Sequence, residues 1–269
     1  EHAIDCYQNA LKVRTRKAFP KEWINTQSNL ALVFLERIQG DRAENLEQAI
    51  AYCQNALQVC TCETFPEQWA NIQNNLALAY RDRLREERVA NLEKAIDCLQ
   101  NASQVFTLET FPEKWAWAQH NLATVYCELI DGNREQNLER AISCSQKALQ
   151  VFTSRAFPEY WARTQMNLGN AYRERICGNR VKNLKQATIC YQNALQVCTR
   201  EAFPERWALI QANLSTVCYD KEQISETIKC CQLALEIYTP TSFPLYCFRG
   251  GRNLGNAAFT IRLWKEAIE

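Results

Sequence analysis

The sequence has little of what turns, charged binding sites and membrane spans require. It contains seven glycines, seven prolines and two histidines in 269 residues, and its formal net charge is only +1. No apolar run approaches the roughly 18 residues needed to cross a bilayer. The near-zero charge gives no electrostatic reason to expect nucleic acid or a membrane as a partner. We therefore expect a cytoplasmic, mostly helical protein.

Signatures of catalysis and of bound cofactors are missing as well. No phosphate-binding loop, nucleophile elbow or metal-ligand spacing occurs, and the two histidines, His2 and His120, lie in helical patterns. We predict that the chain is not an enzyme and has no catalytic residue, cofactor or metal site. Catalysis, if a parent protein has any, would reside in a domain outside these residues.

The fourteen cysteines are abundant but do not follow the spacing of zinc ligands. They exchange with apolar and aromatic residues at equivalent places of a repeat, as Cys98 and Cys144 do with Tyr52. Cysteine behaves in this way when it serves as a small buried hydrophobe. We predict reduced structural thiols, with a metal or disulfide role as the alternative.

One pattern organises the whole chain. The segment FPEQWANIQNNLALAY at 65–80 recurs in close variants, with its proline at positions 20, 66, 112, 158 and 204, and a weaker copy begins at Pro244. Periods of 20 to 50 residues are typical of stacked repeats, in which one unit cannot bury its apolar face alone. We predict a single solenoid whose 46-residue repeats are 19–64, 65–110, 111–156 and 157–202, followed by a 40-residue repeat at 203–242. Residues 1–18 would be the second helix of a truncated repeat and 243–269 an incomplete last repeat, so we expect a piece of a longer parent.

Each repeat is predicted to hold two helices. The first would run from Pro66 to about Arg85, because proline favours the first helical position. The second would follow Asn91, an N-cap candidate, matched by Asn45, Asn137 and Asn183. Ala95 and Ala102 would form a small-residue seam that lets neighbouring helices approach closely.

Leu76, Ala77 and Tyr80 on the first helix, with Ala95 and Ala102 on the second, resemble the tetratricopeptide repeat over the whole chain. That family's unit has 34 residues, so this chain adds about six at the Phe-Pro end and about six in the loop between the helices. The extended form, FP-x-x-WA-x-x-Q-x-NL, is similar to arrays upstream of caspase-like CHAT domains in bacterial multidomain proteins. The resemblance implies an all-α, right-handed superhelical solenoid of antiparallel helix pairs, about twelve helices in all, whose first helices line a concave groove.

Two columns of polar residues on the first helices are the candidate partner-binding site. The amide column is Asn29, Asn75, Asn121, Asn167, Asn213 and Asn253. In the family, asparagine at this place often binds a peptide backbone, and an amide offers both donors and an acceptor; the alternative is that it only fixes repeat stacking. Seven residues further lies the acidic column of Glu36, Asp82, Glu128, Glu174 and Asp220. This column would favour a basic partner, or else be a solvated or salt-bridged face helped by Arg37, Arg83 and Arg175.

Trp117 and His120 interrupt the regular columns and are the most partner-like spot, while the buried-stripe column Gln27, Gln73, Gln119, Gln165 and Gln211 is interpreted as structural. We predict a protein-interaction scaffold that binds a peptide or helix in its groove, as the sensor or regulatory array of a larger bacterial protein. The alternative is a regulatory module that docks in cis on a caspase-like protease domain or self-associates through its uncapped ends.

Overall fold

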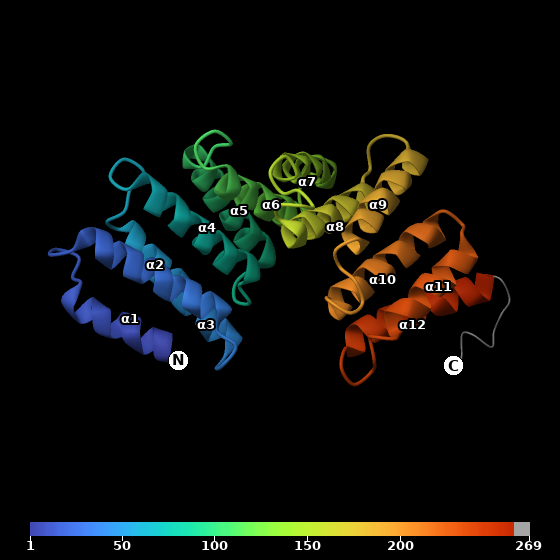
Figure 1. The fold of residues 1–269 in the computed structure, drawn as a ribbon, viewed down its shortest axis with the longest axis horizontal. Coiled ribbons are helices and arrows are strands. Elements are labelled where there is room, and N and C mark those ends of the chain that lie inside the picture. Colours follow the sequence, from blue (N-terminus) through green and yellow to red (C-terminus); the bar gives the residue numbers. More distant parts are fainter. Residues whose placement is uncertain (261–269) are drawn as a thin grey trace. The chain divides into compact units, whose positions relative to one another are not determined.

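The structure, a computed structural model, describes residues 1–260 and consists of helices joined by short loops, with no strand in that range (Figure 1). The first helices of the repeats are α2 (Pro20–Glu36), α4 (Pro66–Asp82), α6 (Pro112–Glu128), α8 (Pro158–Glu174), α10 (Pro204–Asp220) and α12 (Pro244–Thr260). The second helices are α1 (His2–Val13), α3 (Arg42–Leu57), α5 (Arg88–Val105), α7 (Arg134–Ala148), α9 (Arg180–Leu195) and α11 (Ile224–Leu235). The predicted all-α array of repeating helix pairs is confirmed.

The chain divides into two compact units, Glu1–Arg134 and Glu135–Glu269. In the first unit the pairs α2 with α3 and α4 with α5 pack most extensively, and the first helices α2, α4 and α6 also touch in succession. In the second unit α8 pairs with α9 and α10 with α11, while α8, α10 and α12 touch in succession. The prediction of a single continuous solenoid with the repeat boundaries given above stays a prediction.

The six first helices each have 17 residues and begin at the proline of the Phe-Pro pair. Proline fits there because its missing N–H would have no partner in the first turn. The preceding residue, Phe65, has φ −143° and ψ 66°, and its carbonyl accepts the N–H of Trp69 at 2.8 Å. The predicted end near Arg85 was about one turn too late, since α4 ends at Asp82.

The second helices start earlier than predicted. Asn45 does not cap α3: the helix begins at Arg42, and the cap is Asp41, whose carboxylate accepts the N–H of Glu44 at 2.8 Å. Asn45 is buried and donates Nδ2–H to the carbonyl of Gln39 at 2.9 Å. Asn91 and Asn183 bond the carbonyls of Arg85 and Cys177 in the same way, both at 2.8 Å. The asparagine therefore fixes the loop from inside the helix, which satisfies a loop carbonyl that would otherwise be buried alone.

The loops between paired helices turn through one left-handed residue. Gly40, Gly132 and Gly178 have φ between +77° and +81°, and Glu86 takes the equivalent place with φ +64°. The fifth repeat is six residues shorter, two in this loop and four in the second helix, and it turns at Glu222, φ +59°. There the N–H of Gln223 bonds the carbonyl of Cys218 at 2.8 Å and that of Glu222 bonds Tyr219 at 2.9 Å. This is a Schellman ending, a motif that usually has glycine at the left-handed place.

The cores are built on the alanine seam. In the first unit Ala70 and Ala102 are fully buried with Phe106, and Trp69 and Trp115 pack on this cluster while half-buried. In the second unit the core includes Ala187 and Leu214. Within residues 1–260, no helix combines the length and the apolar composition that a membrane crossing requires.

Candidate partner-binding face

The amide column lies on the first helices, as predicted, but its members differ in exposure. Asn29 is exposed, Asn75, Asn167, Asn213 and Asn253 are half-buried, and Asn121 is only 6% exposed. Asn75 donates Nδ2–H to Ser28 Oγ at 3.3 Å, and Asn213 donates to Asn170 Oδ1 at 3.1 Å. Both bonds join consecutive first helices. The geometry of these two residues therefore supports a part in repeat stacking.

A hollow of about 460 Å³ opens between α2 and α4 in the first unit. Its walls are lined by Asn25, Ser28, Asn29, Leu32, Gln68, Asn71 and Asn75. Four of these side chains are asparagine amides, two from each helix, and none of the lining side chains is charged. Each amide offers two N–H donors and an oxygen that accepts. Such a lining matches the alternating N–H and C=O groups of an extended peptide backbone, whatever its side chains.

Trp117 and His120 lie on α6. Trp117 is half-buried, but His120 is 2% exposed. His120 and the neighbouring Asn121 therefore present almost no surface to a partner. This burial does not support a contact of either residue with a partner. Sequence spacing did not reveal the burial, because the equivalent residues are exposed or half-buried in other repeats.

The acidic column is engaged by arginines that the sequence analysis did not select. Asp82 pairs with Arg42 at 3.6 Å and Asp220 with Arg180 at 2.5 Å, and Glu128 pairs with Arg88. Every one of these arginines opens a second helix, and its carboxylate partner ends the first helix of the following repeat. Glu174 also contacts Arg173 at 2.8 Å, whereas Glu36 is exposed. Partial burial raises the pKa of the Glu128 carboxyl although Arg88 contacts it.

The same arginines also hold their own repeat. Arg42 donates Nη1–H to the carbonyl of Leu35 at 2.5 Å, and Arg134 donates to that of Cys127 at 2.8 Å; Arg88 and Arg180 bond the carbonyls of Arg81 and Arg173. These carbonyls lie in the last turn of a first helix, where no intrahelical donor remains. These arginines form a column of their own, since they recur every 46 residues at 42, 88, 134 and 180. That recurrence could have revealed them in the sequence.

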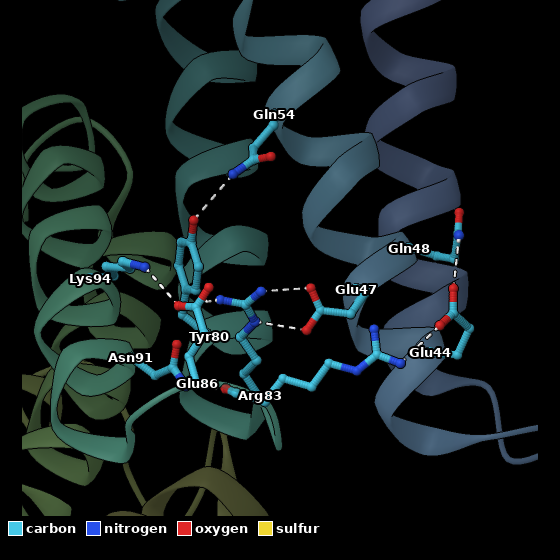
Figure 2. A network of polar contacts seen from close by, with 10 residues as sticks. Glu44, Glu47, Gln48, Gln54, Tyr80, Arg83, Glu86, Asn91 and Lys94 are labelled. Atoms are coloured by element: carbon cyan, nitrogen blue, oxygen red, sulfur yellow. Dashed lines mark hydrogen bonds and ion pairs between the residues drawn. The ribbon is translucent and has the colours of Figure 1, made fainter.

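The alternative of a salt-bridged acidic column named Arg37, Arg83 and Arg175 as its partners, but the bonds of these arginines go to other carboxylates. They bond Glu1, which precedes α1, and Glu47 and Glu139, which lie on the second helices α3 and α7 of the preceding repeats. Figure 2 shows Arg83 meeting both carboxylate oxygens of Glu47, each at 2.7 Å. These hydrogen bonds lower the pKa of Glu47. The sequence did not predict these pairs, because their members are 36 positions apart and the repeat pattern indicates only which residues share a face of one helix.

Further contacts surround this network in Figure 2. Gln54 donates to the Tyr80 hydroxyl at 3.2 Å, and Lys94 pairs with Glu86 at 3.0 Å. Contacts of Glu86 with Lys94 and Arg83 lower its pKa. The arrangement binds adjacent repeats to each other, so it explains stacking rather than recognition of a partner.

The glutamine column is buried, as its structural interpretation requires, with exposures of 6% to 8%. Within the described part of the chain, the Oε1 atoms of Gln27, Gln73 and Gln119 accept no hydrogen bond. A buried carbonyl oxygen of this kind is usually satisfied by an ordered water.

The cysteines are free thiols and most are buried. Burial raises the pKa of Cys60 and Cys144 to about 11 and that of Cys98 and Cys190 to about 12. Within residues 1–260, no group of three or more metal-ligating side chains comes together. The environments of the buried cysteines agree with the prediction that they serve as small hydrophobic residues.

No family model and no curated protein matches this chain. The crystal structure of BtubC (BKLC) from P. vanneervenii is similar with a TM-score of 0.55 and 17% identity, over 82% of this chain and 86% of that one. Acl4, the assembly chaperone of RpL4, gives a TM-score of 0.60 and 14% identity, over 98% of this chain and 92% of that one. A complex of the TPR2AB domain of yeast Sti1 with pHSP90 covers 99% of this chain and 91% of that one at 14% identity, but its TM-score of 0.30 is too low to support an argument. The first two likenesses define the class by fold alone, an array of repeating helix pairs.

Proposed function

We propose that this chain is a protein-interaction scaffold that binds an extended peptide of a partner in the hollow between α2 and α4. The observation that carries the proposal is the uncharged, amide-rich lining contributed by both helices. Binding through the peptide backbone requires donors and acceptors in one place, and four asparagines supply both. Placing the array in a larger bacterial protein, as its sensor or regulatory part, rests on the sequence resemblance alone.

The residues that carry recognition in this proposal are Asn29 and Asn71, with Asn25 beside them. Asn25 and Asn29 are exposed and Asn71 is half-buried, so a ligand can reach their amides. Leu32, which is 40% exposed, adds an apolar contact for one side chain of the peptide. The acidic column contributes little, because arginines already neutralise Asp82 and Glu128. The proposal therefore does not retain a preference for basic peptides.

The test begins by selecting peptides on the immobilised chain from a phage library of random linear sequences. Affinities of the selected peptides are then measured by calorimetry for Asn29→Ala/Asn71→Ala and for a matched control, Asn55→Ala/Asn101→Ala. The control removes one exposed and one half-buried asparagine from the second helices α3 and α5. We expect the first double variant to lose roughly ten- to hundredfold in affinity, since two hydrogen bonds of about 0.5–1.5 kcal/mol are removed, and the control to bind normally.

The proposal fails if no peptide is selected, or if both double variants lose affinity equally. Circular dichroism must show equal helicity and equal melting for the two variants. Because the lining is uncharged, affinity should change little between low and high salt. A steep salt dependence confined to basic peptides would instead assign recognition to the acidic column. Concentration-dependent sedimentation without peptide binding would favour self-association.

A further inference from the structure

The connection from α1 to α2 is far more basic than its equivalents in the next two repeats. Residues 12–21, the basic loop, carry five cations and no carboxylate. The cations are Lys12, Arg14, Arg16, Lys17 and Lys21. The equivalent segments 58–67 and 104–113 each carry two glutamates and no cation. The same connection between helices forms with either charge, so packing does not explain the cations.

The charge of the basic loop is not compensated by the rest of the protein. All five residues are exposed, and none of them forms an ion pair with another residue in the range 1–260. By contrast, every lysine and arginine from Arg37 to Lys114 contacts a carboxylate. Even with the neighbouring Glu22 included, residues 12–22 carry five cations and one carboxylate, a net charge of +4. The uncompensated positive charge can therefore attract an anionic group.

Hydrogen bonds to uncharged groups hold the two arginines of the basic loop. Arg14 donates Nη1–H to Thr26 Oγ1 at 3.2 Å. Arg16 donates to Gln58 twice, to Oε1 at 3.3 Å and to the carbonyl oxygen at 3.2 Å. The loop itself is compact, because the N–H of Phe19 bonds the carbonyl four residues earlier at 3.0 Å. Neutral acceptors orient a guanidinium without neutralising it, so a ligand that pairs with these arginines has little side-chain disorder to remove.

The places of Lys17 and Lys21 face solvent even where repeats pack on both sides. Their equivalents in the second repeat, Glu63 and Glu67, are exposed, although α4 contacts α2 and α6 in succession. A partner can therefore reach both lysines without moving a helix.

The neighbouring connections limit what kind of anion fits. The contact with Gln58 places the basic loop beside the second connection, and the pair of Lys114 with Glu67 at 2.6 Å joins the second to the third. These neighbours carry the exposed carboxylates of Glu63 and Glu109. A long polyanion such as nucleic acid, or a flat anionic membrane, would meet these like charges, whereas a short acidic segment meets only the cations.

We propose that the basic loop is a docking surface for a short acidic segment of a partner protein. Carboxylates of the segment pair with Lys17 and Lys21 and accept charged hydrogen bonds from Arg16. Val13 and Phe19, which are 70% and 47% exposed, add apolar contacts beside the charges. The basic loop shares no residue with the lining of the hollow between α2 and α4, so this surface does not depend on peptide binding there.

The experiment measures fluorescence anisotropy of a labelled dodecapeptide of alternating glutamate and serine on the whole chain. Lys17→Glu/Lys21→Glu should weaken binding roughly tenfold or more, since attraction becomes repulsion; the fold accepts the change because glutamate stands at both equivalent places of the second repeat. Lys182→Glu/Lys185→Glu is the matched control, because it replaces two exposed lysines of α9 and alters the net charge equally. The control should bind like the parent. Glu63→Lys should strengthen binding, because it extends the positive surface into the next connection.

Several results would overturn the proposal. The parent could fail to bind the acidic peptide, or bind a twin with glutamine in place of glutamate equally well. Equal losses in the two charge-reversal variants would assign binding to net charge rather than to the basic loop. Tighter binding of a single-stranded oligonucleotide of the same charge, or of phosphatidylserine vesicles, would identify another class of partner. Affinity of the parent that does not fall with added salt would show that charge does not drive binding, and this reading needs no variant.

Discussion

Replacing Gly169 with alanine should show how closely two helices of the fourth repeat approach each other. A Cβ atom at Gly169 would lie 2.8 Å, 3.0 Å and 3.1 Å from three ring carbons of Tyr191. Tyr191 is fully buried and donates its hydroxyl to Asn170 Oδ1 at 2.7 Å, so the ring has little room to move. In the second repeat the equivalent residues are Ala77 and Leu99. The glycine thus accompanies the larger side chain opposite it.

Two effects of opposite sign determine how much Gly169→Ala changes the free energy of unfolding. Overpacking of a well-filled core costs about 1–3 kcal/mol, whereas alanine in a helix interior is favoured over glycine by roughly 0.5–1 kcal/mol. Gly169→Ala should therefore destabilise the chain by about 0.5–2 kcal/mol. In a Tyr191→Leu background the clash is absent, so the same change should stabilise by about 0.5–1 kcal/mol. The reversal of sign is the diagnostic result, and the coupling energy between the two positions should be about 1–3 kcal/mol.

The assay is urea unfolding of the parent, both single variants and the double variant, followed by circular dichroism. Repeat arrays can unfold in parts, so hydrogen exchange across α8 and α9 should accompany it. Ala77→Gly serves as the matched control and should destabilise, because it removes a helix-favouring methyl without relieving a clash. If Gly169→Ala stabilises both backgrounds equally, the close approach of Tyr191 is refuted.

Three further predictions concern the loops and the ion pairs. Glu222→Gly should raise stability by about 0.5–1 kcal/mol, since the left-handed turn favours glycine; an unchanged or lower melting temperature would contradict this. Glu47→Gln should cost about 1 kcal/mol at neutral pH. Because Arg83 lowers the folded pKa of Glu47, that stabilisation is present above the unfolded pKa of about 4.3 and is lost as the pH falls through the folded value, so a deficit that persists in acid would count against the pair. Arg88→Met should destabilise the chain less at high salt, which screens its pair with Glu128; equal losses in melting temperature at low and high salt would assign its role to the carbonyl contact alone.

The sequence predicted those features that depend on one residue type recurring in one place. Proline starts of the first helices and the buried alanine seam follow from local geometry, which the period repeats. The arginine contacts could not be predicted in this way, because Arg42 reaches a carbonyl within its repeat and a carboxylate 40 residues away, and no spacing rule specifies two targets for one side chain. The prediction that Asn45 caps α3 was wrong because helix capping and the fixing of a loop favour the same residue type. Only the conformation of the loop distinguishes the two roles.

The exposure of the candidate site was the least predictable property. Asn29 and Asn121 occupy the same column, yet one is exposed and the other is 6% exposed. The column determines which face of the helix a residue occupies, while its neighbours determine whether that face is open. The hollow between α2 and α4 likewise depends on residues of two repeats at once.

The short turn at Glu222 has a consequence for how such arrays change over generations. The first helix has 17 residues both before a long loop, as in α8, and before the three-residue turn, as in α10. The six-residue difference therefore follows the first helix: the connection is two residues shorter, and α11 has 12 residues where α9 has 16. The shorter second helix still packs against its partner. Unequal recombination between neighbouring repeats could exchange long and short versions of this part without changing the length of the first helices. An array of this type can thus gain, lose or shorten units while each remaining unit keeps its fold.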